Sequence, residues 1–137
     1  MKGVKPEHLD LLSGCVANVR IPKNEFLFEI EKSADQFFLI RQGRLRLELP
    51  LNPKRSIVIQ TAEENDIVGW SWMIPPYRWH FSGRALDDIV ALSFDAKCIR
   101  KKFSQDHELC SELCIRFSTL VAKRLEETLL QMAHICD

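Results

Sequence analysis

The sequence predicts a mainly β fold, an eight-stranded antiparallel barrel with a short N-terminal helix and a long C-terminal helix. Between residues 15 and 94, short apolar segments recur at regular spacing, separated by turn-forming Gly, Pro, Asn and Asp residues. From residue 107 to about residue 134 there is no Gly or Pro, and apolar residues recur three and four apart, as on one face of a helix. We expect one domain over residues 1–137, with the first helix in 1–14, the barrel in 15–94 and the last helices in 95–137.

Local signals place the individual elements. Residues 6–12 are expected to be helical, because Pro6 is tolerated in a first turn. Asn24 and Asn65 stand at two turns, where Asn tolerates a positive φ better than most residues. Asp95 is the expected N-cap of a short helix that ends at Phe103. The expected strands cover residues 15–21, 26–30, 37–41, 44–49, 56–61, 66–68, 77–85 and 89–94.

Residues 66–86 (DIVGWSWMIPPYRWHFSGRAL) concentrate unusual residue types, including all three tryptophans, the only tyrosine and a Pro-Pro pair. A short strand runs into Gly69, which marks a tight turn or a close approach of the backbone. A helical turn, a stiff proline corner and a strand are expected next. In that strand an apolar set alternates with a polar one, so we expect the apolar set to face the core. The apolar set is Tyr77, Trp79, Phe81, Gly83 and Ala85, and the polar set is Arg78, His80, Ser82 and Arg84.

This order of elements resembles the cyclic nucleotide-binding domain family, whose members include catabolite activator protein-like sensors. Residues 66–86 resemble its phosphate-binding cassette, and residues 34–43 resemble its strand that ends in glycine. Asn24-Glu25 and Asn65-Asp66 stand where the family has Gly-Glu or Gly-Asp. The resemblance implies a jelly-roll barrel, with a ligand pocket and cassette formed by Gly69, Trp70, Ser71, Trp72, Arg78, Trp79, Phe81, Arg84 and Ala85.

Two positions of the cassette depart from the family pattern, in addition to the Asn residues at the two turns and Glu31, where the family often has Gly. The family has a Glu that accepts from the ribose 2′-hydroxyl, and here that position is Trp70, whose indole has a donor and no acceptor. The family's phosphate-binding Arg is matched by Trp79, while Arg78 is one residue away and should face the other side. The pattern favours a pocket filled by aromatic side chains. The proline corner leaves the strand register open, and Arg78 is then the alternative phosphate partner.

Composition and motifs exclude several function classes. The 19 basic residues balance the 19 acidic ones, so no basic face for nucleic acid is expected. No apolar run approaches the roughly 18 residues of a membrane span, and no signal peptide is seen, so we expect a cytoplasmic protein. The scattered histidines and the lack of a nucleophile or phosphate-loop motif indicate no enzyme, no metal and no cofactor apart from the cyclic nucleotide that the family implies. A cupin-like metalloenzyme is disfavoured for the same reason.

The five cysteines are expected to be free thiols, because their number is odd and none forms a CxxC pair. Cys110 and Cys114 are four residues apart on the long helix, which fits half of a metal site. No further ligand stands at suitable spacing, so burial in the core is the favoured interpretation. We therefore expect no structural disulfide.

The long helix predicts how the protein assembles. Leu125, Leu129 and Met132 are expected to extend past the barrel and to form a homodimer interface, as in relatives of the catabolite activator protein. Packing of this stripe on the N-terminal helix is the open alternative. Lys123, Arg124, Glu126 and Glu127 flank the stripe as rim ion pairs.

The functional prediction is a stand-alone regulatory sensor module of the cyclic-nucleotide-binding type. Its pocket is expected to be degenerate or altered, and no helix-turn-helix DNA-binding domain is expected. The alternative is a protein-interaction or dimerisation module without a small-molecule ligand. The expected partners are a second copy of the chain and either a small molecule or a partner protein.

Overall fold

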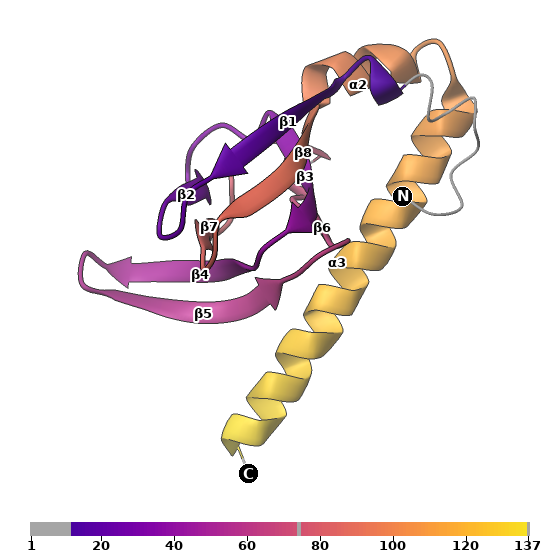
Figure 1. Cartoon of the computed structure of the whole chain (residues 1–137). Coiled ribbons are helices and arrows are strands. Elements are labelled where there is room, and N and C mark those ends of the chain that lie inside the picture. Colours follow the sequence, from indigo (N-terminus) through magenta and orange to yellow (C-terminus); the bar gives the residue numbers. More distant parts are fainter. Residues whose placement is uncertain (1–11, 74, 137) are drawn as a thin grey trace.

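The structure, a computed structural model, describes residues 12–73 and 75–136 and consists of two sheets and a helical C-terminal part (Figure 1). Each described sheet has four antiparallel strands. One has the order β1 (Val16–Ile21), β8 (Ile89–Asp95), β3 (Gln36–Gln42) and β6 (Ile67–Val68). The other has the order β2 (Phe26–Phe28), β7 (Ser82–Ala85), β4 (Leu45–Asn52) and β5 (Arg55–Ala62). The predicted closed barrel is corrected, since no described strand of one sheet pairs with a strand of the other.

The helices are η1 (Ser71–Met73), α2 (Ala96–Phe103) and α3 (His107–Cys136). The predicted N-cap of α2 is confirmed: a side-chain oxygen of Asp95 accepts from the backbone N–H groups of Lys97 at 2.9 Å and Cys98 at 3.2 Å. The short helix predicted in residues 1–14 falls mostly outside the described residues. In the described part of the chain, no helix is both long enough and apolar enough to cross a bilayer.

Two apolar cores form because strand side chains alternate between the faces of a sheet. Phe38 points into the space between the two sheets, and its neighbour Phe37 points to the helical side. The core between the sheets includes Phe28, Phe38, Ile40, Leu45, Leu47 and Trp79. The core on the helical side includes Leu12, Phe37, Trp72, Phe94, Ile99, Leu109, Leu113 and Phe117.

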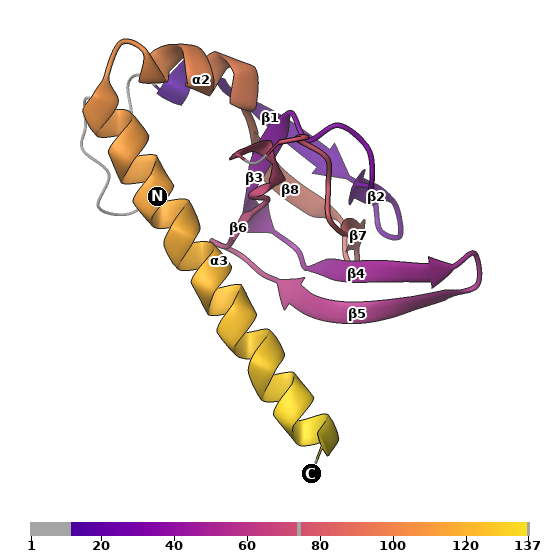
Figure 2. The same ribbon diagram turned by 180° about the vertical axis from the view of Figure 1, so that it is seen from behind.

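Helix α3 changes its environment along its length. Leu109, Leu113 and Phe117 are buried, whereas Leu125 and Leu129 are 58% and 55% exposed. Figures 1 and 2 show the C-terminal half of α3 extending beyond both sheets. Helix α3 therefore runs past the sheets as expected, and the dimer interface stays a prediction.

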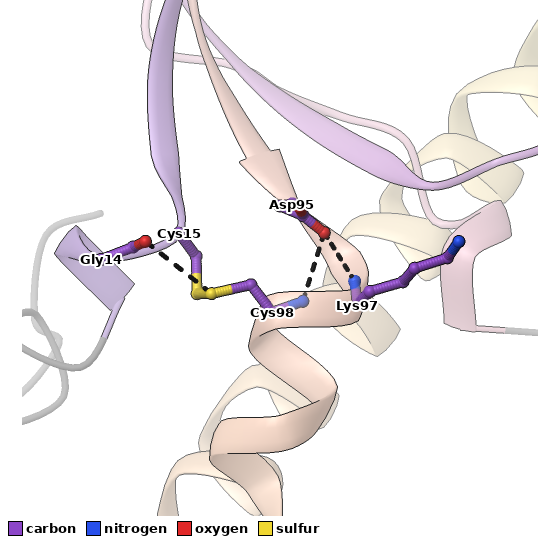
Figure 3. Close-up of a disulfide and its surroundings, with 5 residues drawn as sticks. All are labelled: Gly14, Cys15, Asp95, Lys97 and Cys98. Carbon is purple, nitrogen blue, oxygen red and sulfur yellow. Dashed lines mark hydrogen bonds between the residues drawn. A yellow bond between two sulfur atoms is a disulfide. The ribbon is translucent and has the colours of Figure 1, made fainter.

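A disulfide between Cys15 and Cys98 contradicts the expectation of free thiols (Figure 3). The two residues are 83 positions apart, and their Cα atoms are 5.6 Å apart because β1 begins beside the first turn of α2. Spacing along the chain does not show this proximity. Among the described cysteines, Cys110 and Cys114 are free and half-buried.

The predicted strand over residues 77–85 is shorter than expected, since only Ser82–Ala85 forms β7. Tyr77 has a positive φ of 58°, which breaks an extended strand. Residues 77–79 pair instead with the turn after β2. The backbone N–H of Trp79 donates to the Lys32 carbonyl at 3.0 Å, and the Glu31 N–H donates to the Trp79 carbonyl at 3.0 Å.

Candidate functional site

The glycine turn at Gly69 is packed against the indole of Trp79. Gly69 has a φ of 103°, a conformation that favours glycine. A Cβ atom at this position would lie 2.8 Å from Cη2 and 2.9 Å from Cζ3 of Trp79. Trp79 is 4% exposed, and its ring stacks on Phe28 with 4.0 Å between centroids. The predicted inward orientation of Trp79 is thus observed, and the indole occupies the space beside the turn.

Arg78 points away from this space. Its Nη1 donates to the Glu31 carbonyl at 2.8 Å, and the residue is exposed. The turn that it binds is itself unusual, because Glu31 has a positive φ of 71°. Arg78 therefore holds the turn after β2, and it is not among the residues that line the cavity described below.

Trp70 and Ser71 are both tied to His80. The Trp70 ring stacks on the His80 ring with 4.5 Å between centroids. The Ser71 hydroxyl and His80 Nδ1 are 2.8 Å apart, and Ser71 is fully buried. These contacts fix the segment after the glycine turn against the segment before β7.

Trp72 belongs to the helical core. Its ring lies 5.2 Å from that of Phe37 and 5.3 Å from that of Phe117, measured between centroids. Its carbonyl oxygen accepts from Arg100 Nη1 at 2.6 Å. Trp72 therefore connects η1 to α2 and α3, and it does not line the cavity described below.

Arg84, a member of the polar set opposite the core-facing side chains, is half-buried in an ion-pair cluster. Glu48 is 1% exposed, and its carboxylate lies 3.3 Å from Arg84 Nη2 and 3.0 Å from Arg46 Nε. The Arg84 guanidinium also lies over the Phe26 ring, 4.7 Å from its centroid. Ala85 is fully buried in the core between the sheets.

A cavity of about 280 Å³ lies between α3 and the second sheet, and we call it the α3 cavity. Of the predicted cassette residues, only Trp70 and Phe81 line it, together with Leu125 from the predicted dimer stripe. The remaining lining residues, which sequence reasoning missed, are Leu47, Ile59, Gln60, Val121 and Arg124.

Among the described residues that line the α3 cavity, Arg124 is the one with a charged side chain. Its Nη1 donates to Gln60 Oε1, and Gln60 Nε2 donates to the Arg124 carbonyl at 3.1 Å. Burial lowers the pKa of Arg124, although the carboxylates of Asp66 and Glu127 act in the opposite direction. The prediction of a rim ion pair missed this role. Spacings of four and three residues from Phe117 to Val121 and on to Arg124 would have placed Arg124 on the inward face of the helix.

The described residues offer no obvious metal site. Within residues 12–73 and 75–136, no group of three or more His, Cys, Asp or Glu side chains is placed to hold a metal ion. The candidate ligand site is therefore the α3 cavity, which has apolar walls and one guanidinium–amide pair.

The sequence matches a family model described as "Cyclic nucleotide-binding domain" over residues 18–106. This range contains the glycine turn, the cassette segment and both sheets except the first residues of β1. A comparison with curated proteins found no relative with significant sequence similarity.

Solved structures share the fold at low sequence identity. A cyclic nucleotide-binding domain from Methylobacillus flagellatus aligns with a TM-score of 0.84 and 17% identity, over 97% of this chain and 75% of that one. A putative cyclic nucleotide-binding protein from Geobacter metallireducens gives 0.78 and 20%, over 90% and 89%. The c-di-GMP-responsive global regulator of Xanthomonas campestris gives 0.79 and 13%, over 96% of this chain and 65% of that one.

Proposed function

The chain belongs to the cyclic nucleotide-binding domain family, and from this premise we propose that it is a regulatory sensor module whose ligand site no longer fits a cyclic nucleotide. Domains of this family and the structurally similar regulators are regulatory and not catalytic. The proposal therefore concerns what the module senses and how it transmits the signal.

The observation that carries the proposal is the indole of Trp79 against Gly69. A phosphate group needs charge-assisted hydrogen bonds, and a bidentate Arg supplies them in the family's pattern. Here the matching position supplies an indole that stacks on Phe28 and would contact any Cβ added at Gly69. Arg78 donates to the Glu31 carbonyl and offers no replacement at this place.

The ribose partner is also replaced. Trp70 stacks on His80 and lines the α3 cavity. An indole N–H can donate but cannot accept from a hydroxyl. The O–H donor of a buried sugar hydroxyl would then lack an acceptor, which typically costs about 1–3 kcal/mol.

Calorimetry with cAMP and cGMP tests the proposal. We expect no binding tighter than about 1 μM, because the lost Arg–phosphate contact is worth roughly a hundredfold in affinity. A dissociation constant near or below that value would contradict an altered pocket. The double variant Trp70→Glu/Trp79→Arg restores the family's two residue types, and a gain of affinity in it would assign the loss to these two tryptophans.

We also propose that the module forms a homodimer through α3. Leu125, Leu129 and Met132 are each more than half exposed and are spaced four and three residues apart, as in a coiled-coil seam. Burying a large apolar side chain of this kind contributes about 1.5–3 kcal/mol. Two parallel copies of α3 would cover the stripe on both chains.

Light scattering after size exclusion tests the dimer. We expect a mass near twice 15.9 kDa, and a monomer for the variant Leu125→Glu/Leu129→Glu with its circular dichroism unchanged. Ile115→Glu is a matched control, because Ile115 is 67% exposed on the same helix but lies outside the stripe. A monomeric wild type at tens of micromolar would contradict the proposal.

The second candidate is a dimerisation or protein-interaction module without a small-molecule ligand. The exposed end of α3 favours it, since Leu130 is also 60% exposed beside the stripe. The two candidates differ at the α3 cavity, which only the sensor needs to keep open. Filling it with Val121→Trp should abolish ligand binding in a sensor, whereas a module without a small-molecule ligand has no such binding to lose.

A further inference from the structure

The walls of the α3 cavity indicate the chemical class of its ligand. Resting on the proposed sensor function, we propose that the cavity binds a flat apolar acid of about two fused rings with one carboxylate. The rings would lie against Trp70 and Phe81, and the carboxylate would bind at the Arg124–Gln60 pair.

The volume sets the size of the ligand. A closed apolar cavity of about 150 Å³ is enough to bind benzene. The α3 cavity measures about 280 Å³, close to twice that value. Two fused rings, or one ring with a short side chain, therefore fit its volume.

The lining sets the polarity of the ligand. Of the eight lining residues in the described part of the chain, six are apolar or aromatic, and Gln60 and Arg124 are the exceptions. A ligand rich in hydroxyl groups would leave most of them without hydrogen-bond partners. A ring system instead gains offset stacking on Trp70 and Phe81, whose rings lie 6.4 Å apart at a tilt of 55°. The walls therefore favour a carbon skeleton with its polar atoms at one end.

The Arg124–Gln60 pair sets the charge of that polar end. A guanidinium presents five N–H donors in a planar fork that matches a carboxylate, and Gln60 Oε1 accepts from Nη1. Burial lowers the pKa of Arg124 even with Asp66 and Glu127 acting on it, so the surroundings disfavour its charge on balance. A bound carboxylate would favour that charge.

The position of the cavity gives the ligand a route to the proposed dimer. Val121, Arg124 and Leu125 contribute the α3 wall, while Leu47, Ile59 and Gln60 contribute the sheet wall. A ligand in the cavity contacts both walls at once. Leu125 is also the first residue of the exposed stripe, so occupancy of the cavity changes the surroundings of the dimer seam.

The test compares two probes of one shape by calorimetry on the full chain at pH 7.5. The first is 2-naphthoate, an anion, and the second is 2-naphthamide, its neutral counterpart. We expect naphthoate to bind at least tenfold more tightly. Arg124→Gln should abolish that preference, and Lys123→Gln, which removes the same charge from an exposed neighbour, should retain it. Val121→Trp should abolish binding of both probes by filling the cavity.

Several outcomes overturn the inference: no binding of naphthoate to the wild type, equal binding of the two probes, a preference that survives in Arg124→Gln, or binding that survives in Val121→Trp. The comparison of probes on the wild type stands even if a variant fails to fold, which circular dichroism reports. Titrating cAMP into the same preparation separates this inference from the proposed function. Tight cAMP binding contradicts the altered site, whereas failure of naphthoate alone contradicts only the ligand class.

Discussion

Replacing Gly69 by Ala tests whether Trp79 is pressed against the glycine turn. Alanine at a φ of 103° is strained, at a cost of about 1–3 kcal/mol. Its Cβ would also lie 2.8 Å from Trp79 Cη2. The indole must then shift, and forcing extra atoms into a packed core costs about 1–3 kcal/mol more. The sum is about 2–6 kcal/mol.

Thermal unfolding measures this loss. A chain of 137 residues has an unfolding entropy of roughly 0.29 kcal/mol per degree near its melting temperature. The Gly69→Ala variant should therefore melt roughly 7–20 °C below the wild type. Far-UV circular dichroism during heating gives both melting temperatures.

A double-mutant cycle with Trp79→Phe isolates the steric part. Phenylalanine lacks the distal indole atoms that approach Gly69, so in that background Gly69→Ala should cost only the φ strain. The coupling energy should be about 1–3 kcal/mol. Gly43→Ala is the matched control, because Gly43 has a φ of 90° and its added Cβ would meet Asp88 instead. An equal cost of Gly69→Ala in both backgrounds would refute the packing that underlies the proposed function.

Two further predictions concern cross-links and charge. Reduction of the Cys15–Cys98 disulfide should lower the melting temperature by roughly 7–14 °C, since a cross-link between residues 83 apart is worth about 2–4 kcal/mol. The Cys110→Ser variant is the control, and its melting temperature should fall on reduction as much as that of the wild type. If reduction changes the melting temperature of the wild type by no more than about a degree, the cysteines are free thiols as first expected. The Arg44 guanidinium, by its hydrogen bond, lowers the pKa of Asp87, so the pair stabilises the protein above the usual carboxyl pKa and loses this effect as the pH falls through the lowered value. Asp87→Asn should therefore melt below the wild type at pH 7, and the difference should shrink as the pH falls through the lowered pKa of Asp87. A difference that does not change with pH would contradict the assignment.

Local chemistry made much of the fold predictable from the sequence. Asn24 and Asn65 have positive φ values of 75° and 72°, as their residue type indicated. Asp95 caps α2, and the three- and four-residue spacing of apolar residues defined α3. These features depend on neighbours in the sequence, which is why one sequence was enough.

The errors arose where distant segments meet. The alternation pattern correctly placed Trp79 inside, but it extended a strand through Tyr77, whose positive φ breaks it. Pairing of Cys15 with Cys98 depends on β1 lying beside α2, which chain spacing does not reveal. The burial of Glu48 depends in part on its contact with Arg84 of β7, a strand that is distant in the sequence.

The uneven burial of α3 divides the helix into a short N-terminal part that is packed in the core and a longer C-terminal part that is largely exposed. The packed part is held in the core by Leu109, Leu113 and Phe117, and the α3 cavity begins one turn later at Val121. The exposed part of the helix is about 22 Å long from Phe117 to Met132, so a tilt of about 10° at Phe117 would move Met132 by roughly 4 Å. In the proposed dimer, a small tilt of α3 caused by a change in the contents of the cavity would therefore displace the end of the helix far enough to change its contacts with the partner helix.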